Sequence, residues 1–141
     1  MPLEIERKFL VISDTYKDNA QSSDIKQTYL SVTEKMSIRV RIDGIQGSLA
    51  VKSKVSDRVN REYEYSIPLD EARSLMNMDD LPFIHKTRYL IQYEGRTWEV
   101  DEFHDDNEGL IVAEIELDAE NDIIKIPLWV GEEVTADYRY L

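Results

Sequence analysis

Apolar and polar residues alternate over short segments along almost the whole chain. A two-residue period is typical of a β-strand with one buried face, because successive side chains of a strand point to opposite sides. The pattern predicts strands at Glu4–Ile12, Gln27–Val32, Ser37–Asp43, Ser48–Lys54, Glu62–Ile67, His85–Tyr93, Thr97–His104 and Ile111–Leu117. The chain is therefore expected to be mainly β.

Turn-forming residues join several of these strands. Asp43-Gly44, Glu94-Gly95 and the segment 105–109 each stand between two predicted strands and favour antiparallel hairpins. A many-stranded antiparallel sheet of this size closes into a barrel or folds into a sandwich, since both arrangements limit exposed edges. The sequence pattern alone leaves both open.

Helices are predicted to be few, short and peripheral, which gives an α+β chain with little α. One follows Pro68-Leu69, with Asp70 as its cap, and another opens at Thr135. The inner face of the first consists of Ala72, Leu75 and Met76. No linker, repeat or low-complexity tract divides the 141 residues, so a single domain spanning 1–141 is expected.

Charged residues recur two apart on the predicted strands. Most strands carry one sign, in the pairs Arg39 and Arg41, Lys52 and Lys54, Glu62 and Glu64, Lys86 and Arg88, Glu99 and Asp101, and Glu114 and Glu116. The first strand places Glu4, Glu6 and Lys8 on one face. Any single pair is explained by a solvent-facing side of a sheet. Like charges side by side cost stability, so their repeated occurrence indicates bound counter-charges.

If these faces point into a barrel, carboxylates bind divalent cations there, while arginines and lysines bind phosphate oxygens. The seven candidate acids are Glu4, Glu6, Glu62, Glu64, Asp101, Glu114 and Glu116. The seven candidate bases are Lys8, Arg39, Arg41, Lys52, Lys54, Lys86 and Arg88. Such a lumen is nearly neutral when empty, and added metal ions make it attractive to a polyphosphate.

The overall composition excludes several classes of function. A net charge of -12 argues against binding to nucleic acid or anionic lipid, so no nucleic-acid or membrane partner is expected. The chain has no cysteine, which excludes disulfides and a thiolate nucleophile and agrees with a cytoplasmic location. Charges among residues 1–12 interrupt any signal peptide. His85 and His104 lack metal-ligand or triad spacing, and the five glycines form no phosphate-binding loop.

The segment Glu4-Ile5-Glu6-Arg7-Lys8 resembles the E-x-E-x-K signature that opens the CYTH family, the triphosphate tunnel metalloenzymes. The resemblance covers nearly the whole chain and continues through Gln27-Thr28-Tyr29-Leu30, Arg39-Val40-Arg41, Lys52, Arg61-Glu62-Tyr63-Glu64, Lys86-Thr87-Arg88-Tyr89, Trp98-Glu99-Val100-Asp101, Glu114-Ile115-Glu116, Glu133-Val134-Thr135 and Arg139-Tyr140. Many motifs in family order make the resemblance specific.

The resemblance implies an eight-stranded antiparallel closed barrel whose charged tunnel binds a triphosphate with Mg²⁺ or Mn²⁺. The short chain is most similar to the bacterial tripolyphosphatase branch, which implies hydrolysis of inorganic tripolyphosphate. Family members commonly continue beyond the Arg-Tyr pair into a helix near the tunnel, whereas this chain stops at Leu141. We therefore expect either a more open tunnel or limited activity.

Site roles follow from the resemblance. Glu4, Glu6 and Glu114 are expected to hold one metal ion. Glu64, Asp101 and Glu116 are expected to position a second ion or its water, and Glu62 completes the acidic set. The expected phosphate ligands are Lys8, Arg39, Arg41, Lys52, Lys54, Lys86 and Arg88. Lys8, Tyr29, Glu64 and Glu116 form the expected catalytic set, in which Tyr29 orients Lys8 or the substrate.

Other functions remain open on the sequence alone. A class IV adenylate cyclase shares the barrel but requires a nucleoside pocket that the sequence does not identify. A nucleoside or thiamine triphosphatase differs only in its substrate. A non-catalytic polyphosphate or nucleotide binding module is the alternative from another class, although the full set of acids argues against it. Whether the barrel forms a homodimer is also left open.

Overall fold

A computed structural model describes residues 3–18, 20–78, 80–137 and 139 of the chain. The strands are β1 (Leu3–Val11), β2 (Gln21–Val32), β3 (Met36–Asp43), β4 (Gln46–Lys54), β5 (Val59–Ile67), β6 (Phe83–Tyr93), β7 (Arg96–Phe103), β8 (Ile111–Leu117) and β9 (Val130–Glu133). They are accompanied by the helix α1 (Leu69–Met76) and the 3₁₀ turns η1 (Thr15–Lys17) and η2 (Asp105–Asn107). Tyr140, from the last sequence motif, lies outside the described residues.

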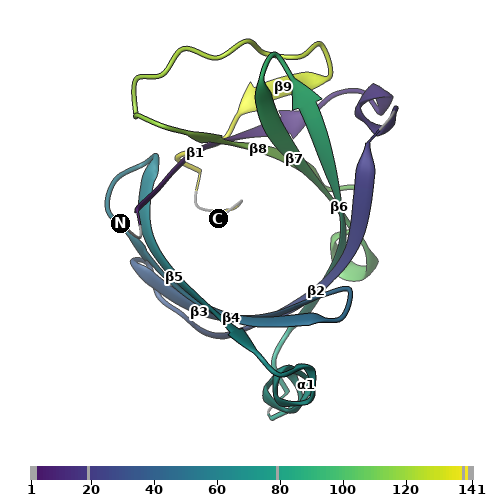
Figure 1. Cartoon of the computed structure of the whole chain (residues 1–141), viewed down its shortest axis with the longest axis vertical. Coiled ribbons are helices and arrows are strands. Elements are labelled where there is room, and N and C mark those ends of the chain that lie inside the picture. Colours follow the sequence, from purple (N-terminus) through teal and green to yellow (C-terminus); the bar gives the residue numbers. More distant parts are fainter. Residues whose placement is uncertain (1–2, 19, 79, 138, 140–141) are drawn as a thin grey trace.

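Eight of the strands form a closed antiparallel barrel, which Figure 1 shows as a ring viewed along its axis. Hydrogen-bonded neighbours follow the order β5-β4-β3-β2-β6-β7-β8-β1. The ring closes where β1 pairs with β5, with Leu3 opposite Arg61 and Ile5 opposite Val59. The predicted eight-stranded closed barrel is confirmed, and the sandwich alternative is excluded. Closure leaves the barrel without a free edge of the kind that promotes aggregation.

The apolar side chains pack on the outside of the barrel wall. One cluster joins Phe9 on β1 and Trp98 on β7 to Tyr16 of η1 and Trp129 of the segment before β9. The rings of Trp98 and Trp129 meet edge to face with centroids 5.6 Å apart. Such aromatic burial is a main source of stability, and here it fastens the segment 118–129 and β9 to the wall.

A second apolar cluster lies under α1. Ala72 and Met76 face Val40 on β3, and Leu75 packs at its edge, so the predicted inner face is confirmed. Gly47 permits this contact, because a Cβ there would lie 2.9 Å from the Cβ of Ala72. The prediction of Asp70 as the cap is wrong. The cap position is Pro68, which makes no side-chain cap hydrogen bond, and its fixed backbone angle starts the helix without one.

Two strand predictions are incomplete. β2 begins at Gln21 and not at Gln27, because its polar first half forms a full ladder with β6 in which Gln21 lies opposite Leu90. Backbone pairing with β6 makes that segment a strand, although its side chains do not alternate between apolar and polar. β9 was not predicted. It has four residues and pairs with β1 outside the barrel ring, with Phe9 opposite Glu133.

The helix predicted to open at Thr135 is also wrong. Thr135 lies in a turn directly after β9. Its hydroxyl accepts a hydrogen bond from the backbone N–H of Lys8 at 3.0 Å, so the residue is held against β1. Within the described ranges, no helix has the length and apolar character needed to cross a membrane.

Candidate active site

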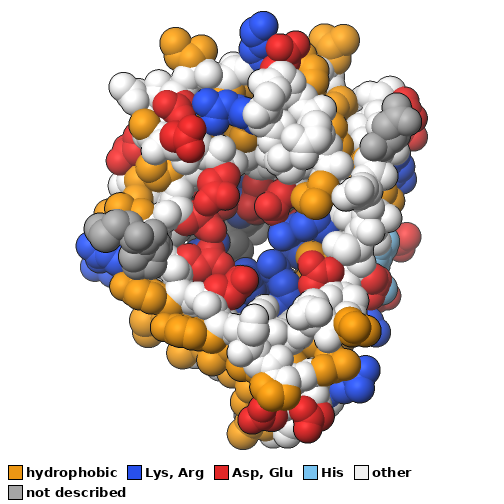
Figure 2. Space-filling view, viewed as in Figure 1, with side chains coloured by type: hydrophobic (Ala, Val, Ile, Leu, Met, Phe, Trp, Pro, Cys, Tyr) orange, Lys and Arg blue, Asp and Glu red, His pale blue; other side chains and the backbone are white. Residues whose placement is uncertain are grey.

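A large cavity of about 1430 Å³ occupies the centre of the barrel. Figure 2 shows its opening, with acidic side chains gathered on one side and Lys and Arg side chains on the other. All fourteen charged residues predicted to face the lumen, together with Tyr29, line this cavity. They are Glu4, Glu6, Lys8, Arg39, Arg41, Lys52, Lys54, Glu62, Glu64, Lys86, Arg88, Asp101, Glu114 and Glu116. The inward orientation inferred from the two-residue period is therefore observed on every one of their strands.

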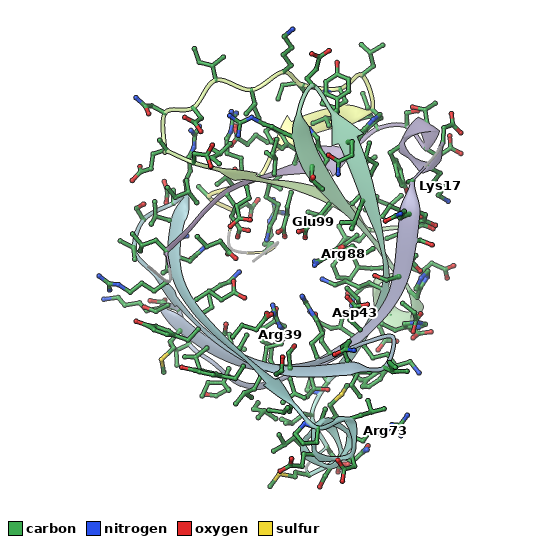
Figure 3. The ribbon with its side chains drawn as sticks, in the orientation of Figure 1. Lys17, Arg39, Asp43, Arg73, Arg88 and Glu99 are labelled. Carbon is green, nitrogen blue, oxygen red and sulfur yellow. The ribbon has the colours of Figure 1, made fainter. Side chains whose placement is uncertain are left out.

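Strand order divides the tunnel wall into two charged halves. The four contiguous strands β7, β8, β1 and β5 supply the seven acids, and the strands β4, β3 and β6 supply six of the seven bases. Lys8 on β1 is the exception. β2, between β3 and β6, contributes the uncharged Gln27 and Tyr29 to the lumen. Figure 3 shows Arg39, Arg88 and Glu99 pointing into the ring, whereas Lys17 and Arg73 lie outside it. This division places cations opposite carboxylates across the space that a ligand would fill.

Lys52 connects the two halves near the barrel closure. Its Nζ lies 3.1 Å from Glu4, 3.7 Å from Glu6 and 3.7 Å from Glu62. Burial, a hydrogen bond with Glu62 and repulsion from Glu6 raise the pKa of Glu4 to about 9. Burial and repulsion from Glu114 raise the pKa of Glu6 to about 7. Three carboxylates thus crowd around one ammonium group, which does not balance them.

Glu114 lies deeper, opposite Lys8. The Lys8 Nζ is 3.4 Å from Glu114 Oε1, and the two residues face each other in the β1–β8 register. Burial alone would raise the pKa of Glu114, but the surrounding Lys8, Lys52 and Lys86, together with Arg88, hold it below its ordinary value. The surrounding cations therefore favour the ionised form of Glu114, whereas burial and neighbouring acids favour the protonated form of Glu4.

The basic half is organised around Asp101. Arg88 donates two hydrogen bonds to its carboxylate, and Lys86 Nζ donates a third at 2.7 Å. Burial lowers the pKa of Lys86 to about 8, and the charges of Arg41 and Arg88 lower it further. The carboxylate of Asp101 acts in the opposite direction and raises the pKa of Lys86. The sequence prediction grouped Asp101 with the metal ligands, and the structure places its carboxylate against the lumen cations Lys86 and Arg88.

Arg39 and Arg41 face the lumen from β3 with spare hydrogen-bonding capacity. Arg41 directs Nε and Nη2 to a single acceptor, Gln27 Oε1, at 2.9 and 2.8 Å. Burial and repulsion from Arg39 and Arg88 lower the pKa of Arg41 to about 10, so it stays charged at neutral pH. Among the described residues, the buried Nε of Arg39 has no acceptor. Buried donors without acceptors are costly, and an anionic oxygen would satisfy them.

Three residues of the site were not in the predicted set. Glu99 contacts Arg88 Nη1 at 3.0 Å, and Gln27 orients Arg41. The signal for Glu99 was present, because it shares the two-residue period of Asp101. Gln27 lies two residues before Tyr29 on the same inward face of β2, and it opens the motif Gln27-Thr28-Tyr29-Leu30, but its uncharged side chain was assigned no role. Thr135 also lines the cavity, and its sequence position had been interpreted as a helix start.

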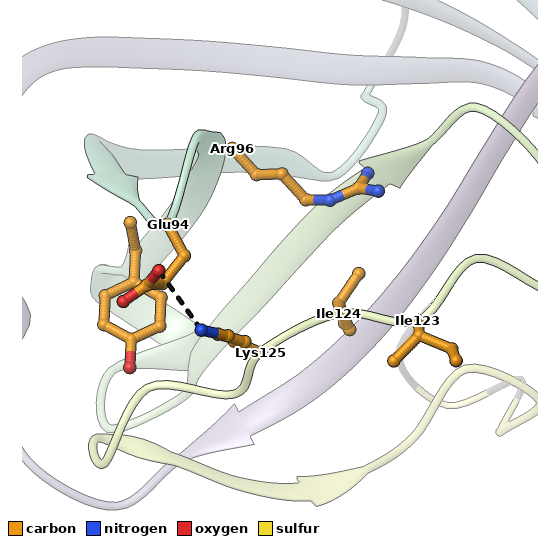
Figure 4. Close-up of a pocket in the computed structure, with 6 residues that line it drawn as sticks. Glu94, Arg96, Ile123, Ile124 and Lys125 are labelled. Carbon is orange, nitrogen blue, oxygen red and sulfur yellow. Dashed lines mark ion pairs between the residues drawn. The ribbon is translucent and has the colours of Figure 1, made fainter.

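A second hollow lies outside the barrel, at the β6–β7 turn (Figure 4). Its volume of about 190 Å³ is a small fraction of the tunnel volume. Glu94 and Lys125 form an exposed ion pair of 3.6 Å across it, beside Ile123 and Ile124. Its third charged lining residue, Arg96, lies 3.5 Å from Asp122. The charges around this hollow are thus paired with opposite charges, whereas like charges gather in the tunnel, so the tunnel is the candidate active site.

A closed barrel with acids on one half of its lumen and bases on the other defines a charged tunnel domain. The model of the CYTH domain family matches residues 2–141, and the chain belongs to this family. It is 46% identical over 142 residues to an inorganic triphosphatase of Acetivibrio thermocellus, covering all of this chain and 91% of that protein. It is 34% identical over 143 residues to an inorganic triphosphatase of Nitrosomonas europaea, covering 97% and 92%.

A solved structure described as an inorganic triphosphatase superposes with a TM-score of 0.67 at 29% identity. The match covers 97% of this chain and 92% of the solved chain. The agreement therefore extends over the whole barrel and over the segments packed outside it.

Triphosphatases of the CYTH family are generally metal-dependent, and the acidic half of this tunnel fits a divalent cation. Its donors are carboxylate oxygens, the ligands that Mg²⁺ and Mn²⁺ prefer. Glu4, Glu6 and Glu62 already surround a cationic group, the ammonium of Lys52. In the part of the chain that the structure describes, no three acidic or histidine side chains form a ready-made cage, so these carboxylates would reorient to bind an ion.

Proposed function

We propose that this protein hydrolyses a linear triphosphate, converting inorganic tripolyphosphate and water into pyrophosphate and phosphate. The observation that carries the proposal is the convergence of seven acids and seven bases on one lumen, in two separate halves. Two relatives at 46% and 34% identity, both named inorganic triphosphatase, support this substrate. The proposed functional unit is the single domain 1–141.

In this proposal the basic half binds the phosphate chain. Arg39 and Arg41 grip one phosphoryl group through planar guanidinium groups, and Lys86 and Arg88 neutralise its neighbour. Lys8, Lys52 and Lys54 add positive charge along the tunnel. Phosphoryl transfer depends mainly on alignment and charge stabilisation, so a fixed row of cations addresses the main requirement of the reaction.

The acidic half would bind the metal ion and orient the attacking water. We propose Mg²⁺ or Mn²⁺ with Glu4, Glu6 and Glu114 as ligands, and Glu62 as a neighbouring acid. Asp101 is retained as a candidate for a second ion. When bound, such an ion acts as a Lewis acid toward the phosphate oxygens.

Water is proposed to attack the terminal phosphorus. The new P–O bond forms as the bond to the bridging oxygen breaks, and pyrophosphate leaves. Glu64 and Glu116 are assigned to orient the water and accept its proton. Glu64 is suited to contact with water because it lines the cavity with half of its side chain exposed, 3.5 Å from Arg39. Tyr29 is assigned to orient Lys8 or the substrate.

The test is to incubate the pure protein with tripolyphosphate, ATP and thiamine triphosphate, each with Mg²⁺, with Mn²⁺ and with a chelator. We expect tripolyphosphate to be hydrolysed fastest and only with metal. Equal or faster turnover of ATP, above all with cyclic AMP as product, would overturn the substrate assignment. Tight binding of all three without turnover would instead identify a binding module. The partner is proposed to be a small molecule, and the absence of cysteine supports the cytoplasm as location.

A further inference from the structure

The partner of β1 changes at Lys8. Along the edge of β1 that faces away from β8, strand β5 pairs only with the segment Leu3–Ile5. The N–H of Glu6 then donates to the carbonyl of Arg58 at 2.8 Å. Beyond this point the edge is covered by β9, where Val11 lies opposite Val130. Lys8 stands at the junction of the two covering segments.

Thr135 fills this junction with its side chain. Its Oγ1 accepts a hydrogen bond of 3.0 Å from the backbone N–H of Lys8, and Val134 N donates to the Lys8 carbonyl at 2.8 Å. Thr135 is buried, with 9% of its surface exposed. A side chain therefore takes the place of the missing strand hydrogen bond at a residue whose own side chain lines the tunnel.

The hydroxyl of Thr135 is itself fixed. It donates to Glu133 Oε2 at 2.6 Å, and Arg7 holds the carboxylate of Glu133 with bonds of 2.9 and 2.6 Å. The hydroxyl hydrogen of Thr135 is thus donated to Glu133, and the lone pairs of Thr135 Oγ1 accept from the backbone N–H of Lys8. These contacts form one chain, Arg7 to Glu133 to Thr135 to Lys8, and it begins and ends on neighbouring residues of β1.

We propose that Thr135 is a positioning residue, which sets the Lys8 ammonium against the substrate with the support of Glu133. The inference rests on the proposed function, because Lys8 is assigned there as a substrate ligand. On its other edge Lys8 is held by β8, opposite Glu114. Thr135 completes the fixation from the opposite edge of β1. Displacement of a catalytic group by about 1 Å costs up to roughly 100-fold in rate, so such fixation has a measurable effect.

The decisive variant is Thr135→Val, which keeps the shape and removes the hydroxyl. We expect it to raise KM for tripolyphosphate roughly tenfold or more with a smaller loss in kcat, because Lys8 binds the substrate. Thr135→Ser keeps the hydroxyl and should restore KM to within about twofold of the wild type. Thr28→Val is the matched control. Thr28 is fully buried on the outer face of β2, and among the described residues its hydroxyl has no hydrogen-bond partner.

A wild-type KM in folded Thr135→Val would overturn the inference. Thr135 would then only fill the junction between the two segments that cover β1. The same applies if Thr135→Ser behaves like Thr135→Val. Should Thr135→Val fail to fold, Glu133→Gln replaces it, with an expected rise in KM of about threefold, and an unchanged KM again overturns the inference. If the wild type does not hydrolyse tripolyphosphate, the proposed function fails on its own. In that case the affinities of Thr135→Val and Thr28→Val for tripolyphosphate are measured by calorimetry. Equal affinities of the two variants overturn the inference.

Discussion

Arg88 holds the carboxylate of Asp101 through two parallel hydrogen bonds, from Nε at 2.8 Å and from Nη2 at 2.9 Å. Burial alone would raise the pKa of Asp101, but Arg88 and Lys86 keep it below its ordinary value. The bidentate geometry fixes the guanidinium plane while leaving Nη1 directed to Glu99. Asp101 therefore serves as the shared counter-ion of two lumen cations, and its assignment as a metal ligand stays a prediction.

Asp101→Asn is expected to destabilise the empty protein by about 3 kcal/mol, because it leaves Lys86 and Arg88 without their buried counter-charge. Tripolyphosphate without metal should then raise the melting temperature more in the variant than in the wild type, since the anion supplies the missing charge. The matched control is Glu94→Gln, which breaks the exposed pair with Lys125 and should change stability by less than about 1 kcal/mol. A variant of unchanged stability that binds Mn²⁺ weakly would instead support the metal-ligand role.

Glu114→Gln and Glu116→Gln are each expected to reduce turnover of tripolyphosphate at least about 100-fold while the protein stays folded. Each change keeps the shape and removes a negative oxygen from the acidic half. The two variants differ in their expected stability. Glu114 is surrounded by cations, so its loss should lower the melting temperature, whereas Glu116→Gln should have little effect. Steady-state kinetics with circular dichroism would check both, and wild-type metal-dependent turnover in either variant would contradict the assigned role.

Arg41→Ala is expected to raise KM for tripolyphosphate by about tenfold or more, because it removes a guanidinium group that faces the lumen and is proposed to bind the phosphate chain. Arg41→Lys should recover only part of this loss, since it keeps the charge but cannot offer the planar fork. The control is Arg73→Ala on α1, outside the barrel (Figure 3). Equal KM values for Arg41→Ala and Arg73→Ala would mean that Arg41 does not contact the substrate.

The Arg7–Glu133 pair predicts a pH dependence of stability. The hydrogen bonds from Arg7 lower the pKa of Glu133 below its ordinary 4.5. Because the folded-state value is the lower one, this contribution is complete above pH 4.5 and is lost as the pH falls through the folded value. Glu133→Gln should therefore be less stable than the wild type at pH 7, by up to about 1 kcal/mol, and the difference should narrow below pH 4.5.

Thermal unfolding of both proteins between pH 7 and pH 3 measures this difference. Glu132→Gln, on the same short strand, changes an exposed neighbour and should alter stability little at any pH. A difference between wild type and Glu133→Gln that is constant across the pH range would show that the charge of Glu133 does not matter.

The sequence was sufficient for features that depend on neighbouring residues along one strand. The spacing of Arg39 and Arg41 determined their shared face, because alternation is a local property of extended backbone. The pairing of Lys52 with Glu4 could not be predicted from the sequence, since it depends on which strands become neighbours when the barrel closes. That order is set by contacts between distant segments, and no local pattern records it.

Short or polar segments were missed for a different reason. β9 has four residues interrupted by Gly131, and its stability comes from the edge of β1 that it covers. The first half of β2 is polar and exists as a strand because β6 provides a ladder. Thr135 was misjudged because a threonine after a strand can cap a helix or bind a neighbouring backbone, and tertiary contacts decide between the two.

The apolar clusters of this protein lie outside its barrel, and the fourteen charged residues of the candidate site lie inside. Stability of the fold and binding of a ligand, which usually compete for the same residues, thereby depend on opposite sides of the same wall. Lumen residues such as Tyr29 or Lys54 can be exchanged without repacking Trp98 or Ala72, because alternate positions on each strand point away from the apolar clusters. Selection for a different phosphorylated substrate can therefore act on the inner face while the outer face preserves the fold. The same separation makes this barrel a suitable scaffold for redesign of substrate specificity.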